Sequence, residues 1–115
     1  YRVPTPNIQI ATVPIGYADG LARVLSNHMD VLVNGVRVRQ VGRICMDQFM
    51  FAVDTSRRSL GSVKTVAPVE CGDVVTILGA DGGQTISADE MARLRDTINY
   101  EVTCDFGMRL EKVYV

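Results

Sequence analysis

Residues 29–40 read MDVLVNGVRVRQ and decide the fold. Two apolar runs flank Asn34-Gly35, a pair that favours the positive φ angles of a two-residue type I′ hairpin turn. After the turn, Arg37 and Arg39 alternate with valines, so one face of the second strand should be solvated. The stretch therefore predicts an antiparallel hairpin.

Short apolar runs separated by turn residues continue on both sides of this hairpin. They alternate at a period of two or are bounded by glycine, proline and aspartate, which is typical of strands. We expect strands at Ile8–Val13, Met29–Val33, Val36–Gln40, Phe49–Val53, Val63–Val69, Val74–Leu78, Glu101–Cys104 and Lys112–Val115. This succession predicts a mainly β fold, a small β-barrel-like domain of about eight strands.

One helix is expected within this series. Ser87 and Glu90 fit a capping box, and Met91, Leu94 and Ile98 recur at helical spacing. We place the helix at roughly residues 88–98, with one apolar stripe packed over an open end of the β structure.

Length and charge limit the function classes. The 115 residues suit one domain, residues 1–115, with a single core. A formal net charge of -1 gives no field that would collect nucleic acid or dock on an anionic membrane. No apolar run approaches the roughly 20 residues that span a bilayer. The chain does not begin with methionine, and we expect it to be part of a longer protein.

The cysteines and the single histidine predict no metal site. Cys45, Cys71 and Cys104 form no CxxC pair, and His28 has no second histidine beside it. We expect a reduced, cytoplasmic protein with inert, buried thiols. Gly79–Gly83 lies between two strands, which favours a hairpin turn over a phosphate-binding loop.

Three polar segments could carry chemistry, and each also has a structural interpretation. Tyr17 shares a loop with Asp19, where an exposed phenol could donate to an anion or simply be a half-buried turn residue. Arg43 and Asp47 flank a glycine-bounded bend whose free backbone N–H could hold a carboxylate, but the two side chains could equally pair on the surface. Tyr100 follows the helix and could reach a phosphate or cover the helix end. No self-sufficient catalytic constellation is visible.

Taken in order, three motifs closely resemble the C-terminal domain of alanine racemase. They are Ile15–Gly20, Val41–Gln48 and Thr97–Val102, and the match covers nearly the whole chain. The resemblance implies an isomerase that interconverts L- and D-alanine and supplies D-alanine for peptidoglycan in the cell wall. It further implies a homodimer of two-domain subunits, in which the β domain covers the mouth of the partner's pyridoxal-phosphate-binding (β/α)8 barrel.

The same resemblance assigns roles to individual residues. Met46 would offer its backbone N–H to the substrate carboxylate in the partner's active site, and Tyr17, Arg43 and Asp47 would line the access corridor. Tyr100 matches the tyrosine that binds the phosphate of pyridoxal 5′-phosphate in its own subunit. This chain alone is expected to bind no cofactor.

The two catalytic bases of the family are expected outside this chain. Racemisation needs a base on each face of the carbanion that the cofactor stabilises, and the family uses a barrel lysine and a tyrosine. That tyrosine stands in a Ser-Tyr-Gly motif followed by an aromatic residue, and Tyr1 fits the trailing aromatic. We therefore expect the catalytic tyrosine just upstream of Tyr1 and an inactive isolated domain.

Two other functions remain open from the sequence. The chain could be an inert oligomerisation or binding module that associates through a surface meant for the barrel. It could also belong to a racemase that prefers another small amino acid, such as serine, because selectivity depends partly on the barrel.

Overall fold

The Asn34-Gly35 hairpin forms as predicted in a computed structural model of the chain, which describes residues 1–4, 6–56 and 67–115. Both turn residues have positive φ, 50° at Asn34 and 74° at Gly35. They join β2 (Asp30–Val33) to β3 (Val36–Val41) in antiparallel register. A type I′ turn requires this backbone conformation.

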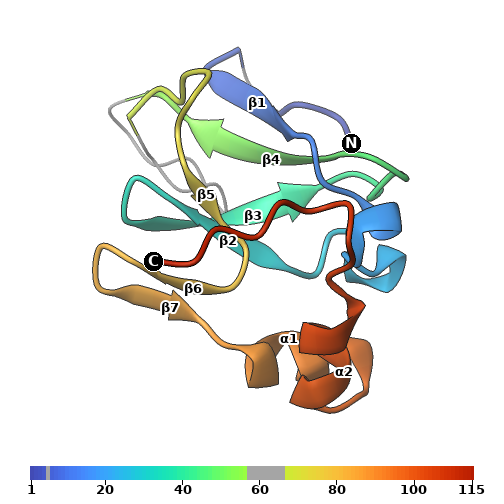
Figure 1. Cartoon of the computed structure of the whole chain (residues 1–115). Helices are drawn as coiled ribbons and strands as arrows, with labels where there is room; N and C mark the ends of the chain where they lie inside the picture. The colour runs from blue at the N-terminus through green and yellow to red at the C-terminus, as the bar shows by residue number, and fades with distance from the viewer. Residues whose placement is uncertain (5, 57–66) are drawn as a thin grey trace.

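The hairpin lies within a five-stranded, curved sheet with the order β1-β4-β3-β2-β5 (Figure 1). β1 (Ile8–Val13) and β5 (Val75–Thr76) are its edges, and β4 (Phe49–Asp54) pairs with both β1 and β3. A separate hairpin joins β6 (Gly79–Asp81) to β7 (Gln84–Ile86), and of the turn predicted at Gly79–Gly83 only Gly82 and Gly83 form the turn, because residues 79–81 are already in β6. The described residues thus form seven strands, arranged as a half-barrel, and the fold is mainly β as predicted.

A glutamine side chain ties β1, one edge of the sheet, to the segment that precedes β5. Gln9 on β1 donates to the Val69 carbonyl at 2.7 Å and accepts from the Val69 N–H at 2.8 Å. Val69 ends the strand expected at Val63–Val69, of which residues 63–66 lie outside the described part of the chain. Residues 67–69 form no strand.

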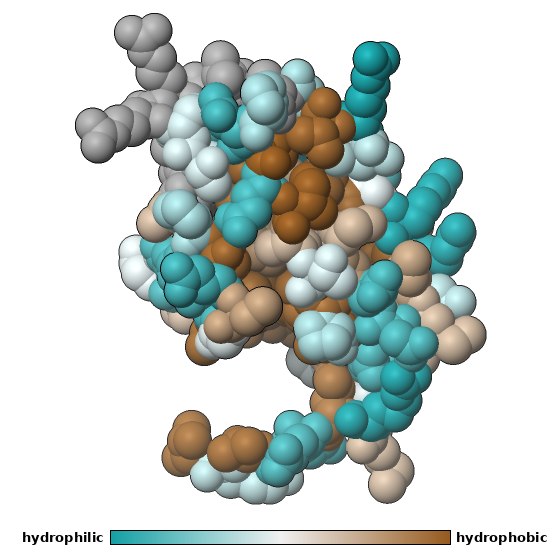
Figure 2. Space-filling model, turned by 90° about the horizontal axis from the view of Figure 1, so that it is seen from above, coloured by the Kyte–Doolittle hydropathy of each residue, from teal (hydrophilic) through white to brown (hydrophobic). Residues whose placement is uncertain are grey.

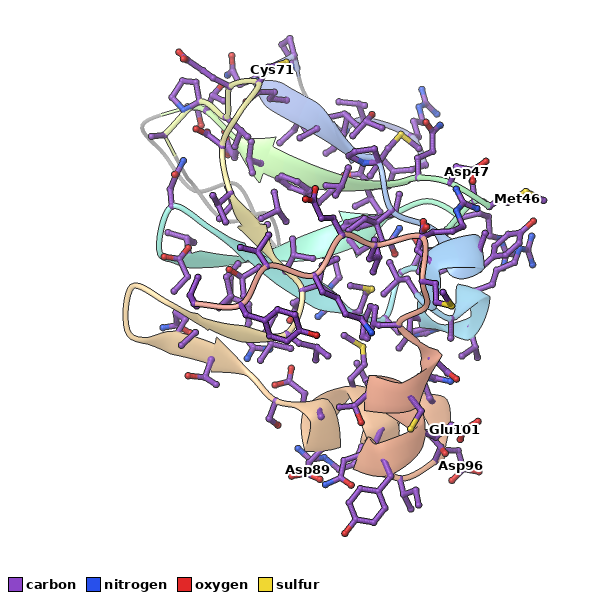
Figure 3. The ribbon with its side chains drawn as sticks, viewed as in Figure 1. Met46, Asp47, Cys71, Asp89, Asp96 and Glu101 are labelled. Carbon is purple, nitrogen blue, oxygen red and sulfur yellow. The ribbon has the colours of Figure 1, made fainter. Side chains whose placement is uncertain are left out.

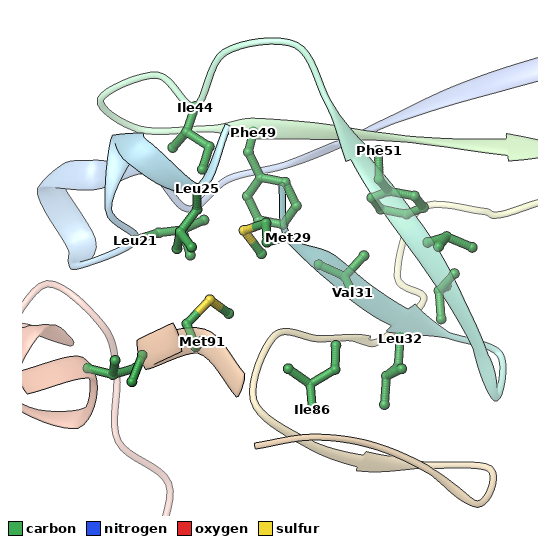
Figure 4. Packing of buried hydrophobic residues seen from close by; sticks show 14 of the residues in the cluster. Leu21, Leu25, Met29, Val31, Leu32, Ile44, Phe49, Phe51, Ile86 and Met91 are labelled. Carbon is green, nitrogen blue, oxygen red and sulfur yellow. The ribbon is translucent and has the colours of Figure 1, made fainter. Parts of the chain in front are cut away.

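The core fills the space between the half-barrel, the β6–β7 hairpin and the first helix (Figure 4). Val31, Leu32 and Val33 are all fully buried, so β2 is covered on both of its faces. Ile86 of β7 and Met91 belong to the same cluster as Phe49 and other buried residues. β2 is therefore the centre of the fold.

Two helices replace the single predicted one. α1 (Ala88–Arg95) begins at Ser87, whose side chain accepts from the Glu90 N–H at 3.1 Å. It ends earlier than predicted because Asp96 adopts a left-handed conformation, with φ of 55°. Of the predicted stripe, Met91 is buried, but Leu94 and Ile98 are 39% and 62% exposed.

The strand predicted at Glu101–Cys104 is wrong, because α2 (Asn99–Asp105) occupies this segment. α2 packs against α1 and buries Val102. The Thr103 hydroxyl bonds back to the Tyr100 carbonyl at 3.0 Å, which satisfies a polar side chain within a helix. Tyr100 therefore lies in the first turn of α2 and not after a helix end.

The C-terminal segment and the thiols also differ from expectation. Lys112–Val115 forms no strand, and the end of the chain extends away from the body (Figure 2). The three cysteines are free, as expected, but all are exposed, so the prediction of buried thiols is wrong. Within the described ranges, no helix is long and apolar enough to cross a membrane.

Candidate functional site

Two loops that are distant in sequence lie back to back and form the core of the site. The Tyr17 N–H donates to the Cys45 carbonyl and the Ala18 N–H to the Met46 carbonyl, each at 3.0 Å. We call Gly16–Gly20 the first loop and Cys45–Gln48 the second loop. Gly16 permits their contact, since a Cβ there would lie 2.3 Å from two carbonyl oxygens of the second loop.

The first loop is a short 3-10 turn, Tyr17–Asp19, held by its own carboxylate. Asp19 is only 4% exposed, and its Oδ2 accepts from the Gly16 N–H at 2.8 Å. The turn ends at Gly20, whose φ is 110° and whose missing Cβ would lie 2.1 Å from the Asp105 carbonyl oxygen. The loop therefore has a fixed backbone and leaves the Tyr17 side chain 42% exposed.

The second loop is anchored by polar groups that precede β2 and end β3. The Ile44 N–H donates to Ser26 Oγ at 3.0 Å, and the Gly42 N–H donates to Asn27 Oδ1 at 2.8 Å. Gln40, which is fully buried, accepts from the Asn27 N–H at 2.6 Å. These bonds fix the chain immediately before Met46.

Met46 and Asp47 lie at the tip of the second loop, which joins β3 to β4 (Figure 3). Met46 is 52% exposed, and its N–H has no hydrogen-bond partner among the described residues. An exposed, unpaired N–H on a fixed loop is suited to bind an anionic oxygen. Arg43, three residues earlier, is exposed as well.

Arg109 connects the two loops, and no local sequence pattern predicts this role. Its Nη2 donates to Asp47 Oδ1 at 2.6 Å, and its Nε lies 3.2 Å from Asp19 Oδ1. The hydrogen bond to Asp47, with the charge of Asp19, raises the pKa of the Arg109 guanidinium above its usual value. The alternative of an Arg43–Asp47 pair is not realised, since Asp47 pairs with Arg109.

Tyr100 does not join this group. Its side chain is 73% exposed on α2, and its hydroxyl has no partner within the described segments. Figure 3 shows its neighbour Glu101 well apart from Met46 and Asp47. The predicted site residues thus occupy two places on the molecule, and the Tyr17, Met46 and Asp47 segments share one of them.

The described residues fit a phosphate-bearing cofactor only in part. The Tyr100 phenol is free to donate one hydrogen bond to a phosphate from outside the domain. Lys112, in the extended C-terminal segment, is the one lysine that the structure describes. No group of three possible metal ligands occurs in the described ranges. The domain can therefore contribute to such a site but does not build one alone.

Comparisons with known proteins point to one family. Residues 1–114 match the family described as alanine racemase, C-terminal domain. Alanine racemase 2 of Caldanaerobacter subterraneus subsp. tengcongensis is 46% identical over 107 residues, which cover 93% of this chain and 25% of the relative. Alanine racemase from Bacillus anthracis with bound L-Ala-P has a TM-score of 0.72 and 44% identity, over 88% of this chain and 23% of that one.

A third relative bears on the cofactor. Alanine racemase from Bartonella henselae, solved with covalently bound pyridoxal phosphate, has a TM-score of 0.70 and 29% identity, over 92% of this chain and 27% of that one. In all three comparisons the chain spans about a quarter of the relative's length. The chain belongs to the alanine racemase C-terminal domain family.

Proposed function

We propose that residues 1–115 are the C-terminal β domain of a pyridoxal-phosphate-dependent alanine racemase. In this proposal the domain follows an N-terminal barrel, and the full-length cytoplasmic homodimer interconverts L- and D-alanine for peptidoglycan precursors. The family match over residues 1–114 and the names of the relatives support it. This chain covers only about a quarter of each relative, which supports the proposal that an N-terminal domain precedes it in the full-length protein.

The free Met46 N–H is the observation that carries the assignment of the substrate site. It lies on a loop that buried polar groups hold in place, and it has no partner in the described part of the chain. We assign it to the carboxylate of the amino-acid substrate in the partner subunit's active site. A charge-assisted hydrogen bond from a preorganised N–H costs little reorganisation when the carboxylate arrives.

Tyr17, Arg43 and Asp47 are assigned to the access corridor. All three are exposed and belong to the segments that surround Met46. The guanidinium of Arg43 attracts a substrate carboxylate, while Asp47 is balanced by Arg109. The corridor thereby favours the approach of a small zwitterion to the Met46 N–H.

Tyr100 is assigned to the cofactor phosphate of its own subunit. Its exposed hydroxyl has no partner among the described residues and can donate to a phosphate oxygen. When bound, pyridoxal phosphate supplies the electron sink for proton removal at the substrate Cα. The two groups that move the proton, a lysine and a tyrosine, are assigned to parts of the subunit outside this chain.

The assignment makes the isolated domain inactive. The purified 115-residue chain is expected to show no alanine racemisation and no cofactor absorbance. In the full-length protein, Tyr17→Phe and Tyr100→Phe are expected to change the apparent affinity for substrate and for cofactor, respectively. Clear turnover by the isolated chain, or two silent tyrosine variants, would overturn the assignment.

A binding or assembly module is the second candidate function. Met108, Val113 and Tyr114 are at least 75% exposed, which leaves apolar surface near the C-terminus free to associate. Analytical ultracentrifugation of the isolated chain tests this alternative. A strict monomer at high concentration argues against it.

A further inference from the structure

Arg109 is the one described side chain that is ion-paired to both loops of the site. Its Nε lies 3.2 Å from Asp19 Oδ1 on the first loop, and its Nη2 donates to Asp47 Oδ1 on the second at 2.6 Å. Asp19 uses its other oxygen to hold the Gly16 N–H. One guanidinium therefore connects the turn that presents Tyr17 to the bend that presents the Met46 N–H.

The backbone around Arg109 is docked against the first loop. The Gly107 N–H donates to the Asp19 carbonyl at 3.2 Å, and the Leu110 N–H donates to the Gly107 carbonyl at 3.4 Å. Gly20 lies against the Asp105 carbonyl with no room for a Cβ. The guanidinium therefore reaches both carboxylates from a backbone that is itself held in place.

The ion pairs of Arg109 with Asp19 and Asp47 should hold the loops more strongly than an ordinary surface ion pair. Asp19 is 4% exposed, and a nearly buried carboxylate without a cation is costly. Removal of Arg109 would also leave two carboxylates on adjacent loops with no positive charge between them. Both effects would push the first and second loops apart.

We propose that Arg109 is a positioning residue for substrate binding, which acts through Asp19 and Asp47 to hold Tyr17 and the Met46 N–H in their mutual arrangement. This inference rests on the proposed function of the two loops. Arg109 contacts the two loops and not the substrate. Its effect is transmitted by the contacts between the first and second loops.

The test uses the full-length protein with Arg109→Gln and Arg109→Lys. Because the Met46 N–H binds the substrate before and during reaction, its displacement should raise KM about tenfold and leave kcat within about twofold. Lys cannot reproduce two contacts in fixed directions, so Arg109→Lys should recover only part of the loss. Arg39→Gln is the matched control, since Arg39 is 52% exposed against 53% for Arg109 and pairs with Asp30 at 2.7 Å on β2.

Hydrogen exchange gives a readout that does not depend on substrate. Arg109→Gln should speed exchange of the Tyr17 and Ala18 N–H groups about tenfold or more, because these two bonds join the loops. Asp47→Asn, which leaves the Asp19–Arg109 contact intact, should give a smaller increase. This second variant keeps the proposal testable if Arg109→Gln does not fold.

The possible outcomes separate a failure of the positioning role of Arg109 from a failure of the proposed function of the two loops. Faster exchange with a raised KM supports the proposal. Unchanged exchange in Arg109→Gln overturns the positioning role. Faster exchange with an unchanged KM also overturns it, provided that Tyr17→Phe still raises KM. In both cases the proposed function of the two loops stands. If Tyr17→Phe and Arg109→Gln both leave KM unchanged, the proposed function of the loops has failed, and the inference fails with it.

Discussion

Gly16 lies so close to Met46 that a Cβ at Gly16 would be 2.3 Å from the Met46 carbonyl oxygen. The φ of Gly16 is -142°, a value that any residue adopts, so the requirement for glycine is steric. Glycine is therefore needed here because another backbone approaches it. The contact ties the presentation of Tyr17 to that of the Met46 N–H.

Gly16→Ala should separate the first and second loops. The added methyl group meets two backbone carbonyls and no flexible side chain, so we expect a loss of about 3 kcal/mol in unfolding free energy. Urea denaturation measures this loss. Gly107→Ala is the control, because its nearest contact would be an ordinary 3.9 Å. Equal stability of the two variants would contradict the close contact.

The sequence predicted the sheet better than the helices because hairpin signals are local. Asn34-Gly35 alone determined the turn and the register of β2 and β3. Glu101–Cys104 alternates like a strand, but the buried Val102 fits one face of a helix that packs on α1 equally well. Tertiary contact decided between the two, and no local pattern could.

The site was predicted in part for the same reason. Tyr17, Met46 and Asp47 stand in recognisable motifs, and the structure brings their loops together. Arg109 was not predicted as a site residue, because 62 positions separate it from Asp47 and only the folded chain joins them. Gln40 lies near the end of β3, as the sequence predicts, and its buried amide also anchors the chain that leads to Met46, which no local pattern indicates.

Gln40→Leu should destabilise the domain and loosen the second loop. The amide accepts from the Asn27 N–H and donates to the carbonyls of Val41 and Gly42. Leucine fills similar space but leaves these groups unpaired, which costs about 1–3 kcal/mol of unfolding free energy.

Thermal and urea unfolding measure the effect of Gln40→Leu. Gln84→Leu on β7 serves as the control, because Gln84 is exposed and makes no side-chain hydrogen bond in the described part of the chain. A Gln40→Leu protein as stable as wild type would show that the amide network contributes nothing.

The Arg37–Glu90 pair should add a small, pH-dependent stability. The hydrogen bond from Arg37 lowers the pKa of the Glu90 carboxyl below its ordinary value of 4.5. A lowered folded-state pKa stabilises the fold above about pH 4.5, and this contribution disappears as the pH falls through the folded value. Because both side chains are partly exposed, we expect less than about 1 kcal/mol.

Glu90→Gln tests this pH dependence. Unfolding free energies of wild type and variant should differ at pH 7 and converge as the pH falls below the lowered pKa of Glu90 in the folded state. Glu111→Gln serves as the exposed-carboxylate control, because Glu111 forms no ion pair among the described residues. A constant gap between wild type and Glu90→Gln at all pH values would rule out the proposed titration.

Mixed dimers test most directly whether this domain binds substrate for the partner subunit. One full-length subunit carries Met46→Pro, which removes the N–H. The other carries alanine in place of the catalytic lysine expected in its barrel. The lysine-variant homodimer should be inactive, and the Met46→Pro homodimer should turn over little substrate at concentrations near or below the wild-type KM, because its own KM is raised. Met46→Leu, which keeps the N–H, should remain active as a control.

Co-expression of the two variants gives the decisive result. If Met46 serves the partner, each mixed dimer has one intact site, and random pairing should restore about a quarter of wild-type turnover. A Tyr100→Ala subunit in place of the Met46→Pro subunit should restore none, since Tyr100 serves its own subunit. No recovery with Met46→Pro would contradict the claim that the second loop acts across the subunit boundary.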